Sequence, residues 1–124
     1  MIEPYVHEDH IARLDKWLTL HRLRVPDKRL FSDCGYVVDN IAIGFLFKTN
    51  SKQAYIDHVA ADPTAKKEAR DAALNKLFEH LENIARREGF LMITALAQLP
   101  SMKRRFECHG FQTYGEYCLY YKVL

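Results

Sequence analysis

One stretch of the sequence, from Asp62 to Gly89, restricts the fold more than any other. Apolar residues recur in it at the three- and four-residue spacing of a single helix face: Ala73, Leu77, Phe78, Leu81, Ile84 and Ala85. Aspartate is a suitable N-cap, proline is tolerated at the first helical position, and glycine commonly ends a helix. The pattern therefore predicts a long helix from Asp62-Pro63 to about Glu88, with one face that must be covered.

The flanking segments have the composition of strands that would cover this face. Gly35–Val38 and Ile41–Lys48 flank Asp39-Asn40, a two-residue turn of types that tolerate positive φ. Gln53–Ala61 follows a second turn, so we expect these three strands to form an antiparallel meander. After the long helix, Phe90–Ala97 is a continuous apolar run, which is typical of a buried central strand.

The remaining segments complete a mixed order of helices and strands. Ile2–Val6 has an extended pattern, and a helix is predicted from about Asp9, its N-cap, to Leu20. A short helix is expected from Pro100 to His109, and the aromatic tail Tyr114–Leu124 has the composition of a last strand or two. We therefore expect one α/β (α+β) domain, residues 1–124, with a mostly antiparallel sheet and the order β-α-β-β-β-α-β-α-β.

Composition excludes several classes of protein. With 48% hydrophobic and 27% charged residues, the 124-residue chain suits a globular domain and not a disordered or fibrous one. The net charge of +2 argues against nucleic-acid binding through bulk charge. The first ten residues lack a signal-peptide pattern, and no apolar run approaches the ~18 residues of a membrane span. Three scattered cysteines favour a reduced, cytoplasmic compartment.

Four motifs occur along the chain in a characteristic order and spacing, the first two being Ile43-Gly44-Phe45 and Val59-Ala60-Ala61-Asp62-Pro63. Together they resemble the GNAT superfamily of N-acetyltransferases, in which the first would belong to the third strand and the second to the end of the fourth. Ala85-Arg86-Arg87-Glu88-Gly89-Phe90 looks like the family's exit from the long helix, and Leu99–Phe111 resembles its C-terminal segment. The resemblance implies direct transfer of an acetyl group from acetyl-CoA to a small-molecule or peptide amine within a ternary complex.

Three departures from the family bear on this activity. The family's Q/R-x-x-G-x-G/A signature lets the backbone at a helix N-terminus approach a pyrophosphate, but the matching Thr64–Leu74 has no glycine and is about one turn longer. Phe106 stands where the family often has a tyrosine general acid, and Leu99 where asparagine is common. The glycine-free loop also resembles phage-encoded members of this fold, not all of which are evident enzymes.

The resemblance implies that the end of the fourth strand holds the cofactor. The backbone of Val59, Ala60 and Ala61 would bind the pantetheine arm of coenzyme A. This requires the fourth and fifth strands to part, because only unpaired backbone groups have free hydrogen-bonding capacity. The alternative is that the two strands stay paired along their length.

Basic residues are the expected contacts of the cofactor phosphates. Cations in the first turn of a helix oppose its dipole, and a bound anion would remove that cost. The residues assigned to this role, with one small side chain that allows close approach, are Lys66, Lys67, Ala69, Arg70, Lys103 and Arg104. The alternative is that they are solvated helix ends.

An amine acceptor must lose a proton during transfer, so a carboxylate or imidazole near the thioester is useful. Asp57 is the first candidate for this general base and His58 the second, with Tyr55 as a further catalytic candidate on the same strand. Alternation along a strand would place Tyr55 and Asp57 on one face and His58 on the other. The alternative is that these polar residues merely face solvent.

Other combinations of residues are weaker candidates for a catalytic or metal site. Cys108-His109 is a poor nucleophile pair because adjacent residues rarely converge on one reacting atom. His7 and His10 match no zinc module, so no metal is expected. Exposed parts of the aromatic tail would suit a homodimer contact. A second class stays open: a GNAT-fold protein that no longer uses coenzyme A and acts as a binding or structural component.

Overall fold

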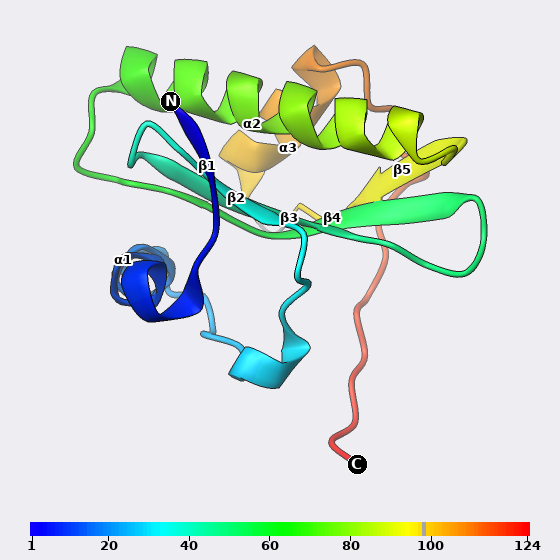
Figure 1. The fold of residues 1–124 in the computed structure, drawn as a ribbon, viewed down its shortest axis with the longest axis horizontal. Coiled ribbons are helices and arrows are strands. Elements are labelled where there is room, and N and C mark those ends of the chain that lie inside the picture. The colour runs from blue at the N-terminus through cyan, green and yellow to red at the C-terminus, as the bar shows by residue number, and fades with distance from the viewer. Residues whose placement is uncertain (98) are drawn as a thin grey trace.

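The computed structural model describes residues 1–97 and 99–124. Its elements are β1 (Ile2–Pro4), α1 (His7–Leu20), the short 3-10 helix η1 (Lys28–Leu30), β2 (Gly35–Val38), β3 (Ala42–Phe47), β4 (Gln53–Ala61), α2 (Lys67–Arg87), β5 (Met92–Ala95) and α3 (Pro100–Cys108). The strands form one sheet in the order β1-β2-β3-β4-β5, antiparallel except for the parallel β4–β5 pair. In Figure 1, α2 and α3 lie on one side of the sheet and α1 on the other. The mixed α/β fold and the meander are confirmed.

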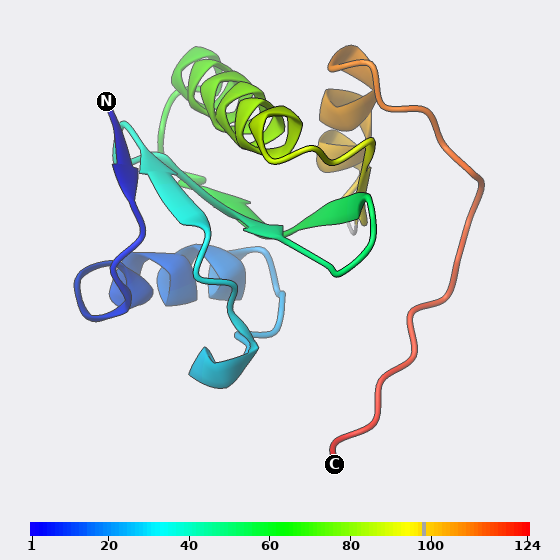
Figure 2. The same cartoon turned by 45° about the vertical axis from the view of Figure 1, so that its right-hand side comes forward.

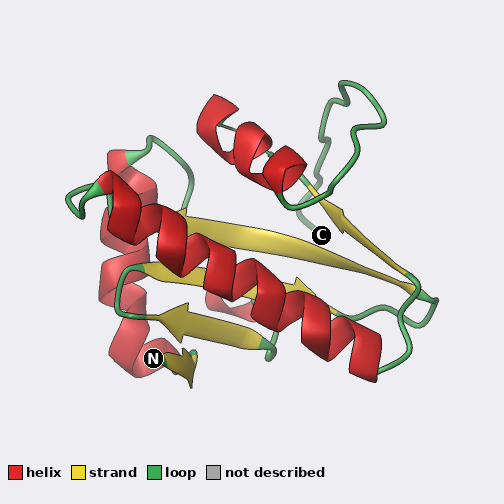
Figure 3. Ribbon diagram, turned by 90° about the horizontal axis from the view of Figure 1, so that it is seen from above, coloured by secondary structure: helices red, strands yellow, loops and turns green. Residues whose placement is uncertain are grey.

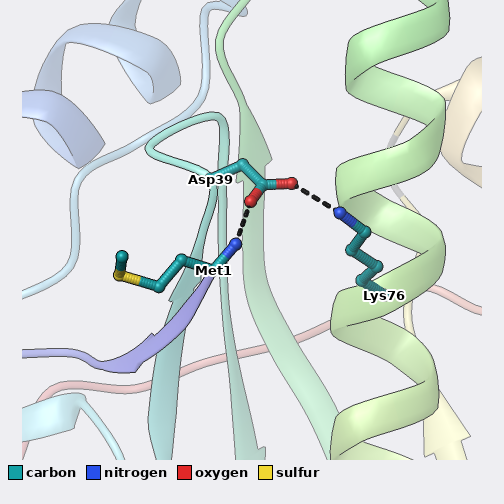
Figure 4. Close-up of polar contacts among 3 residues, drawn as sticks. All are labelled: Met1, Asp39 and Lys76. Carbon is teal, nitrogen blue, oxygen red and sulfur yellow. Dashed lines mark hydrogen bonds and ion pairs between the residues drawn. The ribbon is translucent and has the colours of Figure 1, made fainter.

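The turn between β2 and β3 is fixed by its two predicted residues. Asp39 and Asn40 have φ of 54° and 56°, the left-handed values that a tight hairpin of this kind needs. The Asp39 carboxylate accepts hydrogen bonds from the Met1 amino group and, at 2.9 Å, from the Lys76 ammonium (Figure 4). These cations hold the pKa of Asp39 below its usual value. The turn is thereby joined to the start of β1 and to α2.

The long helix α2 has the predicted apolar face, and all six of its predicted core residues are buried. It ends as predicted at Gly89, where φ is 84° and the Phe90 N–H donates to the Ala85 carbonyl at 3.0 Å, a Schellman closure. Its predicted start was wrong: α2 begins at Lys67. The Asp62 carboxylate instead accepts the Thr64 N–H at 2.9 Å and hydroxyl at 2.7 Å, which closes a local turn before the helix.

The first helix also begins earlier than predicted, at His7, and Asp9 is not its cap. The Val6 N–H donates to Nδ1 of His10 at 2.8 Å, so an imidazole from the first turn satisfies the backbone at the N-terminus. The buried face of α1, formed by Leu14, Trp17 and Leu18, packs in one cluster with the sheet.

Two glycines allow the layers to approach closely. A Cβ at Gly44 of β3 would lie 2.8 Å from Cδ2 of Leu77, so the absence of a side chain here allows α2 to pack closely on the sheet. A Cβ at Gly35 of β2 would lie 2.4 Å from the ring of Phe45, its cross-strand partner. The first contact belongs to the core between the sheet and α2, and the second to the core on the α1 side. Within the residues that the structure describes, no helix is long and apolar enough to cross a membrane.

Two predictions at the C-terminal side were wrong. The apolar segment Phe90–Ala97 is not a buried central strand: only Met92–Ala95 forms β5, which lies at the sheet edge and is partly exposed. Residues 111–124 form no strand, although Tyr114–Leu124 has a strand-like composition. Strand preference expresses packing against neighbouring strands, and in this arrangement the tail makes no pairing that would provide it.

His80 of α2 makes the folded state sensitive to acid. Its ring lies 4.3 Å from that of Tyr36, and burial lowers its pKa below the usual value of 6.5. The unfolded chain therefore binds a proton here at a higher pH than the folded chain does. We expect the free energy of unfolding to fall as the pH decreases below about 6.5.

Urea unfolding at pH 7.5 and pH 5 measures this effect. The variant His80→Phe keeps an aromatic ring against Tyr36 but has no proton to bind, so its loss of stability between the two pH values should be smaller. An equal loss in the wild type and the variant would contradict the assignment to His80.

Candidate functional site

The strands β4 and β5 part before β4 ends. Their parallel pairing runs from Gln53 opposite Met92 to Ile56 opposite Ala95. β4 then continues to Ala61, still paired with β3, while the chain after β5 leads away toward α3 (Figure 3). In the described residues, the segment 57–61 has no pairing with β5. The backbone on that side of β4, including Val59, Ala60 and Ala61, is therefore not engaged by the neighbouring strand.

A β-bulge lies on β4 within residues 57–61, the segment that pairs with β3 but not with β5. The register with β3 shifts between Ile43, which faces Ala60, and Phe45, which faces Asp57. His58, at the bulge, has a φ of 52°, and its N–H donates to the Asp57 carboxylate at 2.7 Å. A histidine in the left-handed region is uncommon, and such backbone strain is concentrated at functional sites.

The bulge corrects the predicted arrangement of side chains on β4. Asp57 is directly opposite Phe45, on the α1 side of the sheet, and the ring of Phe47 contacts the rings of both Tyr55 and His58. The three catalytic candidates therefore share one face, whereas strict alternation placed His58 on the other. The extra residue of a bulge interrupts the two-residue period, which explains the error.

Aromatic rings surround the candidate bases. The His58 ring lies 5.2 Å from Phe31, 6.1 Å from Phe45 and 5.5 Å from Phe47. Its side chain is 19% exposed, and that of Asp57, whose Oδ1 lies 3.9 Å from the His58 Nδ1, is 42% exposed. A carboxylate and an imidazole on one face, open to solvent beside apolar rings, can accept a proton from an amine bound there.

The N-terminus of α2 follows β4 after a loop of residues 62–66. Lys66 occupies the N-cap position without a side-chain hydrogen bond to the helix, so the first N–H groups of α2 are uncapped. None of residues 62–70 has a positive φ, so this loop conformation does not itself require glycine. Among the described residues, Nε of Arg70 is buried without a hydrogen-bond partner. Uncapped N–H groups on a helix whose first turn also carries an unpaired Arg70 Nε–H are suited to an anion.

The other predicted phosphate contacts are divided between the first turn of α2 and the helix α3. Lys67 is exposed and 3.7 Å from Asp71, whereas Ala69 is half-buried. Lys103 and Arg104 are exposed on α3. Their neighbour Arg105 donates to Asp71 and holds the pKa of that carboxyl below its usual value. α3 is therefore tied to the first turns of α2 through Arg105, whereas Lys103 lines the open pocket along β5.

Two contributions to this region were missed from sequence. Nothing in the sequence indicates that Arg105, which follows Lys103 and Arg104, pairs with Asp71. Phe31 lies in the connection after α1, whose sequence shows no pattern, yet its ring stacks on Phe45 at 5.1 Å beside His58.

The histidines of the first helix have structural contacts. Both ring nitrogens of His10 are engaged, Nδ1 by the Val6 N–H and Nε2 by Glu3 at 3.4 Å. His7 Nδ1 lies 3.2 Å from the Tyr5 hydroxyl. Within the described part of the chain, no three His, Cys, Asp or Glu side chains gather in a group that could hold a metal ion.

Comparison with known proteins identifies solved structures of similar fold. No family model matches the chain, and no curated protein matches its sequence. An acetyltransferase from Trypanosoma brucei is 14% identical, with a TM-score of 0.69 and 99% of each chain covered. Glucosamine-6-phosphate N-acetyltransferase from Arabidopsis thaliana is 12% identical, with a TM-score of 0.62, over 98% of this chain and 97% of that one. A transcriptional regulator from Bacillus halodurans is 15% identical, with a TM-score of 0.65, over 98% and 99%. These likenesses show a shared fold.

Proposed function

We propose that this chain, which has the GNAT N-acetyltransferase fold that its motifs predict, transfers an acetyl group from acetyl-CoA to a primary amine. Solved acetyltransferases share the fold along nearly their whole length. The fold alone does not determine the activity, so the proposal rests on the residues of the site. The observation that carries it is the separation of β4 from β5 at the point where β4 leads into the uncapped, basic start of α2.

Each part of the proposed cofactor has a corresponding surface. The backbone of Val59–Ala61 is free of β5 and would bind the amides of the pantetheine arm. The first N–H groups of α2, with Lys66, Lys67 and Arg70, would bind the pyrophosphate beside the small side chain of Ala69. Lys103 and Arg104 of α3 would meet the remaining phosphate charge. When bound, acetyl-CoA would supply an acetyl group activated as a thioester.

The residues on the α1 side of β4 would handle the acceptor. Asp57 would take a proton from the acceptor ammonium, so that the neutral nitrogen could form the C–N bond as the thioester C–S bond breaks. The second proton that the nitrogen loses would pass to the leaving sulfur, which departs as the thiol. His58 is the second candidate for this base, and Tyr55 lines the same face. The acceptor is a small-molecule or peptide amine, the class to which glucosamine-6-phosphate belongs.

Thermal unfolding with and without acetyl-CoA tests the proposal. A ligand that binds only the folded state stabilises it by about 2.7 kcal/mol at 100 times its Kd. We therefore expect the Tm of the wild type to rise with added acetyl-CoA. The variant carrying Lys66→Glu and Lys67→Glu reverses two charges at the α2 N-terminus, and its Tm shift should be much smaller.

A matched control reverses two charges at the other end of the same helix, with Arg86→Glu and Arg87→Glu. Its shift should remain close to that of the wild type. No Tm shift of the wild type at millimolar acetyl-CoA would contradict the enzyme proposal and favour a fold that serves as a binding or structural component. An unchanged shift in the Lys66→Glu, Lys67→Glu variant would contradict the assigned phosphate site alone.

A further inference from the structure

Three aromatic rings from separate elements surround the candidate bases of β4. Phe31 follows η1, Phe47 ends β3, and Tyr55 lies on β4 itself. The ring of Tyr55 stacks on that of Phe47 at 4.8 Å, while Phe31 and Phe47 meet the ring of His58 edge-on, at 5.2 and 5.5 Å. The described residues place no second ring on Tyr55, which is 39% exposed. Its side chain is therefore accessible to a ligand beside the candidate bases.

The helices leave this part of the sheet uncovered. In Figure 2, α1 and η1 lie beneath one part of the sheet, and no described helix lies beneath the part near the turn that joins β3 to β4. Phe47 faces Tyr55 as the last pair before that turn, and Asp57 lies two residues further along β4 on the same face. Two residues of a strand span about 7 Å. A molecule whose ammonium group meets Asp57 can therefore place a second group, one short alkyl link away, against the exposed ring.

The charges near these rings favour a cation over an anion. Asp57 is 42% exposed on the same face, and its carboxylate attracts an ammonium group and repels a phosphate. Aromatic faces also attract cations. The cations closest in sequence to Phe31 and Phe47 already have carboxylate partners: Lys28 with Glu8 at 3.1 Å, Arg29 with Asp27 at 3.0 Å and Lys48 with Glu88 at 2.8 Å. A phosphate on the acceptor would have to displace one of these carboxylates.

We propose that the acceptor is a primary amine joined by a short alkyl link to an aromatic group, and that it carries no phosphate or carboxylate. Its ammonium group lies near Asp57, and its aromatic group lies against Tyr55. A third ring there extends the stacked pair of Tyr55 and Phe47, an arrangement that aromatic rings favour. The inference rests on the proposed acetyl transfer and specifies the class of acceptor that this chain selects.

Acetylation rates for three amines at pH 7.5 test the selection. The amines are 2-phenylethylamine, which has the ring and the link; propylamine, which lacks the ring; and glucosamine-6-phosphate, which carries a phosphate. We expect kcat/KM for 2-phenylethylamine to exceed the other two values by about tenfold or more, the order of effect of one aromatic contact. An equal or higher kcat/KM for propylamine or glucosamine-6-phosphate would overturn the inference and leave acetyl transfer itself supported.

Variants of Tyr55 show whether its ring makes the selection. Tyr55→Ala removes the ring and should lower the ratio of kcat/KM for 2-phenylethylamine to that for propylamine by about fivefold or more. Tyr55→Phe keeps the ring without the hydroxyl and should keep the wild-type ratio. A role of the hydroxyl in proton transfer would lower both rates together and leave the ratio unchanged. A wild-type ratio in Tyr55→Ala would refute the role assigned to the ring.

Binding of the amine without turnover separates this inference from the proposed function. In ¹⁵N-labelled protein with coenzyme A, 2-phenylethylamine should shift the amide signals of Phe47, Tyr55 and Asp57 more than propylamine does at the same concentration. Such shifts without acetylation of any of the three amines would contradict acetyl transfer and support a site that binds aromatic amines. Acetylation of 2-phenylethylamine without these shifts would refute the inference alone, and the absence of both would contradict both.

Discussion

Replacing Asp57 with asparagine is expected to lower the rate of acetyl transfer by about 10²–10⁴-fold, the contribution typical of a general base. Asparagine has nearly the same shape and keeps an oxygen that can accept the His58 N–H, so the bulge of β4 should be retained. What is lost is the carboxylate that receives the ammonium proton. The measurement is kcat/KM for the best acceptor found in a panel of primary amines, together with the Tm shift caused by acetyl-CoA.

The shift in Tm separates catalysis from binding. It should be unchanged in Asp57→Asn, because Asp57 is proposed to contact the acceptor and not the cofactor. Asp15→Asn, an exposed aspartate on α1, is a control that should retain the wild-type rate. A fully active Asp57→Asn beside an inactive His58→Asn would assign the base to His58, and full activity of both variants would refute a base on β4.

Truncating Phe78 to alanine is expected to have the largest effect on stability, about 3–5 kcal/mol, because a large buried ring is replaced by a cavity. Phe78 of α2 is 1% exposed, and its ring lies 5.0 Å from Phe106 and 5.3 Å from His109. It thus joins α2 to α3, the helix that carries Lys103 and Arg104. Urea unfolding at pH 7.5 measures the loss.

The neighbouring residue supplies the control. Glu79 is exposed on the same helix, so Glu79→Ala should change the free energy of unfolding by less than about 0.5 kcal/mol. A loss below 1 kcal/mol in Phe78→Ala would show that the contact between α2 and α3 does not hold the core together as described.

The elements whose bounds were predicted correctly are those determined by residues close together in the sequence. β2 and β4 have the predicted bounds, and α2 ends where Gly89 adopts a positive φ. The turn at Asp39-Asn40 was predicted because few residues accept its backbone conformation. Helix starts were less accurate: Asp62 satisfies its hydrogen bonds within a turn, and a histidine, not Asp9, accepts the backbone N–H at the start of α1.

What could not be predicted depends on contacts distant in sequence. The alternation rule assigned His58 to the wrong face of the sheet, because no residue type in the sequence indicates a β-bulge. The apolar composition of Phe90–Ala97 indicated a central strand, yet among the described residues Met92–Ala95 pairs with β4 alone. Tyr55, Asp57 and His58 lie on one strand, as predicted, but the rings of Phe31 and Phe47 around His58 arise from tertiary packing.

A titration of ¹⁵N-labelled protein with acetyl-CoA, followed by backbone amide NMR, tests the central claim most directly. The amide signals of Val59–Ala61 and of Lys66–Arg70 should shift together and saturate, because the pantetheine arm is proposed to lie along β4 and the pyrophosphate at the start of α2. Signals of the remote η1 residues Lys28–Leu30 should stay in place. Unchanged spectra at millimolar acetyl-CoA, or shifts confined to other parts of the chain, would contradict the account.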